Sequence, residues 1–380
     1  MISRKFIIWA CGLLFVFSSC AEDMVKPIEN DKDAPGTVQD VKTESLPGAV
    51  KFTYTLPSDP DLLYVLAKYT NKTGKVMEFR SSFYTNSVTV EGFGDTDTYK
   101  VELYTVDRSE NRSQPQIVEV APLTPPILSC YESLSVVSDF GGMTFEMDNK
   151  FKSDLAIYVC TPDELGDMVL AETFYSAREE IVYSVRGYDA VPRRFGIFLQ
   201  DKYGNETDTL FTELTPIYER ELDKTKFREM YLQNDSRVES YDGKMEYVWN
   251  GRISKDGDSG GVGLHTGTGT KDGPAVFTFD LGVLAKLSRF ALWAIQDDKH
   301  FYNDMSPRRY EVWGYATEPN PDGSWDQWVK LLDMENVKPS GSPIGILTED
   351  DIEAAKIGDQ ANVPLDMPRV RYIPVSYTHL

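Results

Sequence analysis

The sequence predicts an all-β protein built from three modules in a row, of which the first two are β-sandwiches. Two observations favour the sandwiches. Short segments alternate apolar and polar residues with period two, and a strand–turn–strand pattern recurs 94 residues further along the chain. A third observation sets the last module apart, because five of the six tryptophans lie beyond residue 218.

The first sandwich is predicted over residues 35–122. Its clearest strand patterns cover residues 50–56, 62–69, 87–90 and 99–106, with turn-forming clusters between them. About seven short strands at this spacing are typical of an immunoglobulin-like β-sandwich. The stretch 97–104 resembles the tyrosine-corner region of fibronectin type III domains.

Residues 123–217 are predicted to repeat that sandwich. Asp107 and Asn111 recur as Asp201 and Asn205, and both pairs are 94 residues apart. Aspartate and asparagine in such turns usually bond to their own backbone, so we interpret these residues as structural. The sequence therefore predicts two tandem immunoglobulin-like modules.

Residues 218–380 form the predicted third module. Strand-like runs cover 275–281, 287–295 and 309–315. One helix is expected at residues 349–356, with Thr348 as its N-cap and Asp351 completing a capping box.

The N-terminus has the organisation of a secretory signal over residues 1–19. Arg4 and Lys5 precede an apolar stretch, and two serines stand before Cys20. The apolar stretch is too short for a permanent membrane span. Residues 20–34 are polar and acidic, which indicates a tether.

The end of this signal resembles a bacterial lipobox, although Phe17 stands where leucine is usual. The resemblance implies acylation of Cys20 and a lipid-anchored protein. The acidic residues 21–23 resemble the export signal that sends lipoproteins of Gram-negative gut anaerobes to the outer face of the outer membrane. The expected location is therefore the outer membrane, with the chain exposed at the cell surface.

Charge and cysteine content restrict the partners and the redox chemistry. The formal net charge is −21, and loss of residues 1–19 leaves 37 basic against 60 acidic residues, or −23. Such a chain repels nucleic acid and anionic membranes. Cys130 and Cys160 remain after processing, and either one disulfide or two free thiols fits the sequence.

The last module resembles a discoidin domain, the galactose-binding-like jelly roll of coagulation-factor C-domains. The motifs are Asp242-Gly243 followed by Trp249, the strand 277–282 ending in Asp-Leu-Gly, and the stretches 307–314 and 370–373. The resemblance places Trp249 and Trp293 in the core. Residues 374–380 depart from the family, which has a closing strand there, and a truncated terminus would leave an open sheet edge.

The layout of lipobox, two immunoglobulin-like modules and a discoidin-like module resembles glycan-utilisation lipoproteins of gut anaerobes. These are accessories of starch-utilisation-type uptake systems. The resemblance implies carbohydrate capture without hydrolysis, beside an outer-membrane transporter complex.

The candidate ligand contacts lie in a long polar loop, residues 296–306, and in a tryptophan pair. A sugar-binding site needs an exposed aromatic plane flanked by polar groups. The predicted contacts are His300, Tyr302, Asn303 and Arg308, together with Trp325 and Trp328. For the two tryptophans, stacking on a sugar and packing in the core both remain open.

The discoidin resemblance also implies a structural calcium ion, for which Asp242 would supply one oxygen. Tyr247 replaces the family's usual threonine and removes one ligand.

The three histidines of the chain are not part of any recognisable catalytic motif, so we expect that the protein is not an enzyme. The alternative function is a structural or adhesion lipoprotein that binds a protein partner. A large exposed apolar patch would favour that alternative.

Overall fold

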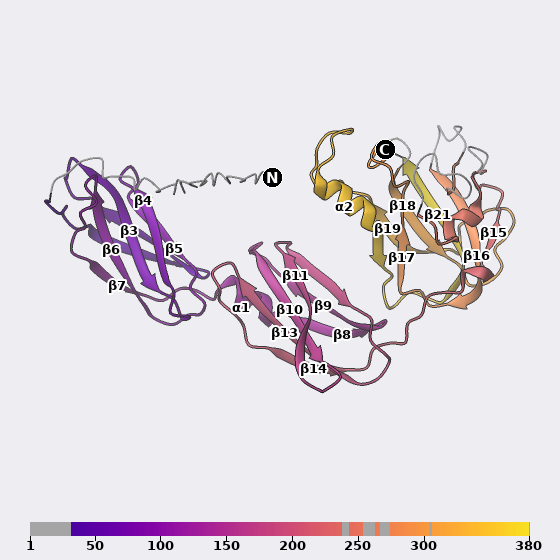
Figure 1. Cartoon of the computed structure of the whole chain (residues 1–380), viewed down its shortest axis with the longest axis horizontal. Helices are drawn as coiled ribbons and strands as arrows, with labels where there is room; N and C mark the ends of the chain where they lie inside the picture. The colour runs from indigo at the N-terminus through magenta and orange to yellow at the C-terminus, as the bar shows by residue number, and fades with distance from the viewer. Residues whose placement is uncertain (1–31, 238–242, 254–262, 267–273, 304–305, 380) are drawn as a thin grey trace, which may run out of the picture. The chain divides into compact units, whose positions relative to one another are not determined.

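The computed structural model describes residues 32–237, 243–253, 263–266, 274–303 and 306–379. Within these residues nearly all regular structure is β (Figure 1). The chain divides into two compact units, which are described separately. The first contains residues up to 135, 145–182 and 194–212, and the second contains 136–144, 183–193 and 213–380.

The first module is a sandwich of a three-stranded and a four-stranded antiparallel sheet. The first sheet has the order β1-β2-β5, with β1 (Gln39–Leu46), β2 (Ala49–Thr55) and β5 (Ser87–Glu91). The second has the order β4-β3-β6-β7, with β3 (Leu62–Thr70), β4 (Val76–Ser82), β6 (Tyr99–Asp107) and β7 (Gln116–Val120). The alternation predicted β2, β3, β5 and β6, and Phe52, Val65 and Leu103 on these strands are fully buried in one core.

The second module has sheets of the same two sizes. The four-stranded sheet has the order β11-β10-β13-β14, with β10 (Leu155–Pro162), β11 (Met168–Ser176), β13 (Arg193–Asp201) and β14 (Leu210–Leu214). The three-stranded sheet has the order β12-β9-β8, with β8 (Ser135–Asp139), β9 (Gly142–Asp148) and β12 (Glu180–Val185). The predicted all-β fold with two immunoglobulin-like sandwiches is therefore confirmed.

One short helix, α1 (Pro126–Glu132), was not expected from the sequence. Pro125 and Pro126 are typical of a linker. A helix can nevertheless begin here, because a backbone N–H in the first turn has no partner within the helix and its absence at Pro126 loses no hydrogen bond. Ile127 and Cys130, three positions apart, are both buried.

The repeated turns are structural, as predicted. The Asp107 carboxylate accepts hydrogen bonds from the backbone N–H of Ser109 and Asn111, at 2.9 and 2.8 Å. Asp201 accepts the corresponding bonds from Tyr203 and Asn205, both at 2.9 Å. Each turn is therefore fixed by its own aspartate.

The C-terminal domain has a five-stranded sheet and a two-stranded sheet. The larger sheet has the order β15-β16-β21-β18-β19, with β15 (Arg228–Met230), β16 (Ala275–Ala285), β18 (Pro307–Gly314), β19 (Val329–Glu335) and β21 (Val370–His379). The smaller pairs β17 (Arg289–Leu292) with β20 (Asp359–Asn362), and the helical segments are η1 (Lys224–Lys226), η2 (Met245–Trp249) and α2 (Glu349–Ile357). Phe290 and Leu292 of β17 pack against a core that includes Phe277, Tyr310 and Ile373, so the sheets form two layers.

The last strand lies inside the larger sheet. β21 pairs with β16 on one side and with β18 on the other, and residues 374–379 continue the strand that begins at Val370. The edges of this sheet are β15 and β19. The discoidin relationship of this domain stays a prediction.

The structure also tests the predictions for the helix near the C-terminus, for two tryptophans and for the two cysteines. The predicted helix is confirmed, because Thr348 and Asp351 form the capping box of α2. Trp249 packs against Phe279, with ring centroids 5.4 Å apart, but the core position expected for Trp293 is wrong, since Trp293 is 40% exposed. The predicted strand 287–295 shrinks to β17, which ends before Trp293. Cys130 and Cys160 are free thiols.

Candidate functional site

The predicted ligand loop connects β17 to β18 and turns its aromatic residues inward. Asp297 starts the turn, because its carboxylate accepts a hydrogen bond from the Lys299 N–H at 2.9 Å and its carbonyl one from the His300 N–H at 2.9 Å. Phe301 and Tyr302 that follow are 4% and 7% exposed. The loop therefore presents little aromatic surface to solvent.

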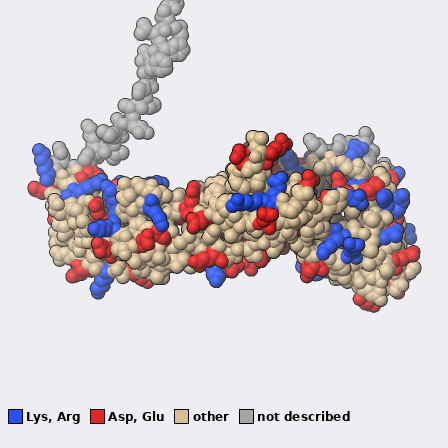
Figure 2. Space-filling model, turned by 90° about the horizontal axis from the view of Figure 1, so that it is seen from below, with Lys and Arg blue, Asp and Glu red and all other residues tan. Residues whose placement is uncertain are grey.

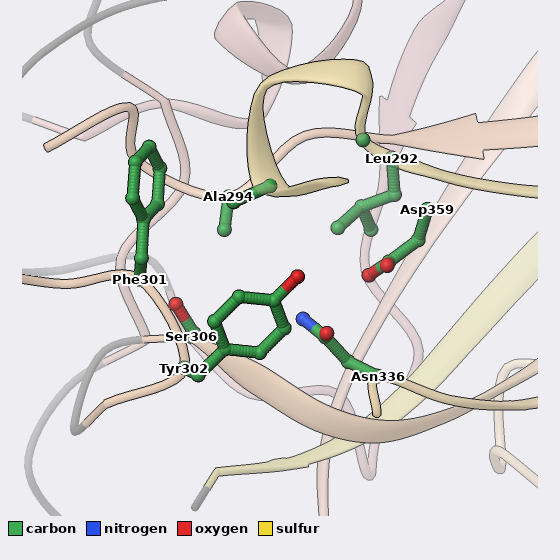
Figure 3. Close-up of a pocket in the computed structure, with 9 residues that line it drawn as sticks. Leu292, Ala294, Phe301, Tyr302, Ser306, Asn336 and Asp359 are labelled. Carbon is green, nitrogen blue, oxygen red and sulfur yellow. The ribbon is translucent and has the colours of Figure 1, made fainter. Parts of the chain in front are cut away.

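Tyr302 lines a small cavity beneath α2. Asn336 and Asp359 point their polar groups toward the Tyr302 ring, while Leu292 and Ala294 supply apolar walls (Figure 3). The cavity volume is about 10 Å³. That is room for one water molecule and excludes a sugar ring.

The electrostatics of this cavity are those of a polar interior. Burial raises the pKa of Asp359, because the charged form loses solvation. Burial, with a smaller effect of the Asp359 charge, also raises the pKa of Tyr302. Burial also raises the pKa of Tyr310, and the nearby Asp359 carboxylate raises it further.

The other predicted contacts in and after this loop are hydrogen-bonded, partly buried or near an opposite charge. The Asn303 side chain donates a hydrogen bond to the Lys299 carbonyl at 3.0 Å. His300 is partly buried. Arg308 is exposed and lies 3.9 Å from Glu335. The structure therefore gathers these residues near one end of β18.

The predicted tryptophans lie near the other end of β18, in a cluster that we call the aromatic cluster. Its members are Trp313, Tyr315, Trp325, Trp328 and Tyr372, with Met230 and Leu232 packed beside them. The rings of Trp313 and Trp325 meet edge to face, with centroids 5.2 Å apart. From Arg308 to Trp313 the strand advances about 17 Å, so the two groups of predicted contacts do not form one site.

Burial separates the members of the aromatic cluster. Trp328 is 8% exposed and packs against Tyr315, with centroids 5.2 Å apart. Trp313 and Trp325 are only partly buried. Trp328 therefore serves mainly in packing, whereas Trp313, Trp325 and Tyr315 are each partly exposed to solvent.

Local sequence explains how the cluster forms. In β18, Tyr310 and Val312 face the core, so Glu311 and Trp313 face the opposite side of the sheet. In the loop before β19, the Trp328 indole N–H donates to the Ser324 carbonyl at 3.0 Å, which closes the turn carrying Trp325. Sequence reasoning missed Trp313 and Tyr315 as site residues, although the alternation in β18 was a usable signal.

Fixed polar groups border the Trp313 ring. Its indole N–H donates to the Glu311 carboxylate at 3.2 Å, and the Lys330 ammonium lies 5.7 Å from the ring centroid. Lys330 bonds to Glu311 at 3.1 Å and to Asp333 at 3.2 Å. The hydrogen bond from Arg309 helps hold the pKa of Asp333 at about 2, so this carboxylate stays charged. The surface next to the ring is polar and close to balanced in charge.

A second ion pair borders the cluster at Tyr372. Arg371 donates two hydrogen bonds to the Asp280 carboxylate, both at 2.8 Å, and its guanidinium lies 5.2 Å from the Tyr372 ring centroid. Bidentate pairs of this kind hold both side chains in one orientation.

No group of three or more histidine, cysteine, aspartate or glutamate side chains in the described part of the chain could hold a metal ion. Asp242, the predicted calcium ligand, and Cys20, the predicted lipid acceptor, lie outside the described residues. None of the helices among the described residues has the length and apolar character needed to cross a membrane.

Comparison with known proteins gives three domain families, each described as a domain of unknown function. They are DUF4959 over residues 35–122, DUF5126 over 123–225 and DUF5000 over 249–379. No curated protein is significantly similar to the chain in sequence.

Among solved structures, a SusE-like protein is 96% identical to this chain over 41% of this chain and 89% of its own, with a TM-score of 0.41. Two fibronectin type III domains of chicken tenascin are 12% identical over 47% of this chain and 99% of theirs, with a TM-score of 0.23. A fibronectin type III domain of the human collagen alpha-1(XX) chain is 14% identical over 26% of this chain and 93% of its own, with a TM-score of 0.22.

The sheets described above define a multidomain β protein with immunoglobulin-like modules. The particular family follows from sequence, because identity of 96% extends over most of the SusE-like protein's own chain. The chain belongs to the SusE-like proteins.

Proposed function

We propose that the chain is a cell-surface lipoprotein that binds carbohydrate with its C-terminal domain, as a non-catalytic accessory of a polysaccharide uptake system. Membership of the SusE-like proteins supports this role. The proposal includes acylation of Cys20, an outer-membrane location and association with an outer-membrane transporter complex.

The observation that carries the proposal is the Trp313–Trp325 pair. Sugar rings have apolar faces and polar edges, so a binding surface combines an aromatic plane with hydrogen-bonding groups beside it. Trp313 and Trp325 meet this requirement, because each ring is only partly buried and so leaves some aromatic surface exposed. Glu311, which accepts a hydrogen bond from the Trp313 indole, is the polar group beside it. Trp325 packs against both Trp313 and Trp328, with ring centroids 5.2 and 6.1 Å away, which orients the pair before a ligand arrives.

The charges beside the cluster favour a neutral glycan. Lys330 is bonded to two carboxylates, and Arg371 is bonded to Asp280. An acidic glycan would have to compete with these carboxylates for each cation. The preferred ligand is therefore a neutral polysaccharide.

The test is affinity electrophoresis of the mature chain through gels containing amylopectin, galactomannan, xyloglucan or β-glucan. Trp325→Ala should weaken binding to the retarding polysaccharide about tenfold, as expected for loss of an aromatic anchor. Trp293→Ala is the matched control, because Trp293 is an exposed tryptophan of the same domain outside the cluster. Equal retardation of Trp325→Ala and wild type would contradict the proposal.

The calcium ion stays part of the proposal, with Asp242 as one ligand. The same gels run with EDTA test it, because loss of a structural calcium should weaken binding or lower the melting temperature of the C-terminal domain. No change with EDTA in either measurement would remove calcium from the proposal.

One observation favours the alternative, a protein partner. The loop after β19 exposes Val337, Ile344 and Ile346, at 68%, 64% and 57%. The double variant Ile344→Ser, Ile346→Ser tests it. If sedimentation shows that the mature chain self-associates and the variant is monomeric, this loop is a protein-binding surface.

A further inference from the structure

An aromatic hollow lies on the outer face of the second module's four-stranded sheet, and Thr73 and Lys75 of the first module also line it. In β10, Leu155, Ile157 and Val159 are buried, so Ala156 and Tyr158 face the other side of the sheet. Ala156 pairs with Tyr175 of β11 on one side and with Gln200 of β13 on the other. A small residue thus lies between an aromatic and an amide side chain.

The width of this hollow follows from strand spacing. Tyr175 and Gln200 are two strands apart, which places their backbones about 10 Å from each other. Ala156 fills little of the space between them. The floor is therefore low, and Tyr158, two positions along β10, borders it at one end. Asp154, Ala156, Tyr158, Tyr175 and Gln200 all line the same hollow.

The polar wall is held in one orientation. The Tyr158 hydroxyl donates to the Gln200 side-chain oxygen at 3.3 Å, and the Gln200 amide donates to Glu206 at 2.7 Å. The amide nevertheless keeps one N–H, and its oxygen keeps one lone pair, for a ligand. Tyr158 is fixed in turn by stacking on Phe198, with centroids 4.8 Å apart and planes 13° apart.

The aromatic wall is unusually open. Tyr175 stands near the end of β11, the edge strand of this sheet, and its side chain is 74% exposed. An exposed ring opposite an oriented amide, above a low floor, matches the faces and edges of a pyranose. Asp154 adds a carboxylate that can accept hydrogen bonds from sugar hydroxyls.

We propose that Tyr175, Tyr158 and Gln200 form a second binding site, which takes one sugar unit of a neutral polysaccharide. The site goes beyond the C-terminal function, because it lies in a different module and uses none of its residues. Two sites on one chain bind a polymer more tightly than either alone, since the second contact is intramolecular.

The experiment uses the mature chain in the same polysaccharide gels. Tyr175→Ala and Gln200→Ala should each weaken binding about threefold to tenfold, and Tyr175→Phe, which keeps the ring, should bind as wild type. Tyr84→Ala is the matched control, because Tyr84 is 83% exposed but outside the hollow. Circular dichroism checks that each variant folds.

The Trp325→Ala background separates this site from the C-terminal one. We expect residual retardation of Trp325→Ala that Tyr175→Ala removes. If Trp325→Ala binds nothing, or if adding Tyr175→Ala changes nothing, the second site is wrong while C-terminal binding stands. If Trp325→Ala has no effect and Tyr175→Ala abolishes binding, the C-terminal site fails and the second site stands. A wild-type chain that no gel retards overturns both.

Discussion

At the scale of single residues, Gly142 decides whether two strands can pair. A side-chain carbon at Gly142 would lie 1.8 Å from the carbonyl oxygen of Val185. Gly142 begins β9 and Val185 ends β12, which are neighbours in one sheet. Backbone contact this close leaves no room for a methyl group unless β12 moves.

Gly142→Ala should therefore lower the free energy of unfolding by about 2–3 kcal/mol, the cost of forcing extra volume into a packed contact. Chemical denaturation of the mature chain measures it. Gly166→Ala is the control, because Gly166 has a positive φ of 92° but open space around it, and should cost only about 1–2 kcal/mol. If the two variants lost the same free energy of unfolding, β12 would be able to move away from Gly142 at little cost.

A buried and an exposed ion pair should likewise differ in how much they stabilise the fold, and Arg186 belongs to the buried one. It lies 3.1 Å from Asp139 and 3.0 Å from Glu219, and the three side chains are 11%, 7% and 17% exposed. Arg186→Ala should cost about 3–5 kcal/mol, because it leaves the buried Asp139 carboxylate without its cation, while Glu219 keeps only Arg289, 3.8 Å away. Arg309→Ala should cost under about 1 kcal/mol, although its bond to Asp333 is only 2.7 Å, since its side chain is 59% exposed. Thermal unfolding distinguishes the two, and similar losses would contradict the role of burial.

Single residues also show where sequence reasoning stopped. Alternation places Trp313 on the outer face of β18, but it does not reveal that Trp325 packs against it from a loop. Loop aromatics have no period, so Tyr302 was expected at the surface and lies 7% exposed. Trp293 was expected in the core and is exposed, because β17 ends one residue earlier.

At the scale of elements, α2 and the loop before it form one unit around Asp351. This carboxylate accepts hydrogen bonds from the backbone N–H groups of Thr348 and Ser340, both at 2.9 Å, and from the Ser340 hydroxyl at 2.8 Å. Lys338 donates to the carbonyls of Ser342 and Pro343, at 3.2 and 2.9 Å, and so holds the other side of the loop. The exposed isoleucines of this loop are therefore held by polar bonds.

The acid sensitivity of this element follows from Asp351. Burial raises its pKa, but the hydrogen bonds from Thr348 and Ser340 outweigh burial and lower the pKa from 3.8 to about 2. The stabilisation is present above about pH 4 and is lost as the pH falls from 4 toward 2. In Asp351→Asn the melting temperature should fall less steeply over that range than in wild type. Parallel curves for the two proteins would show that Asp351 does not control the acid response.

Elements with a period or a repeat could be predicted, and those made by long-range contacts could not. The offset of 94 residues identified the tandem modules, because both copies fix the same turn with an aspartate. Thr348 and Asp351 identified α2 from capping alone. The hollow between Tyr175 and Gln200 depends on the register of three strands, which no local pattern encodes.

At the scale of the whole molecule, charge limits what the surface can bind. The chain carries 39 basic and 60 acidic residues, and on the face shown in Figure 2 lysine and arginine side chains are scattered among carboxylates. Several of the cations near the aromatic cluster are already paired. Neutral ligands avoid both the repulsion by the net charge and the competition for paired cations.

Glycan binding should therefore be almost independent of ionic strength. Stacking on Trp325 or Tyr175 and hydrogen bonds to neutral hydroxyls release no counterions, whereas each ionic contact to a polyanion would add to a salt dependence. Calorimetry between 0.05 and 0.5 M NaCl should give dissociation constants that agree within about twofold. Polygalacturonate, an acidic polysaccharide, serves as the control and should not retard the chain in gels. Binding that weakens steeply with salt, or retardation by polygalacturonate, would instead identify an anionic ligand held by lysine and arginine, because only charged contacts are screened in that range.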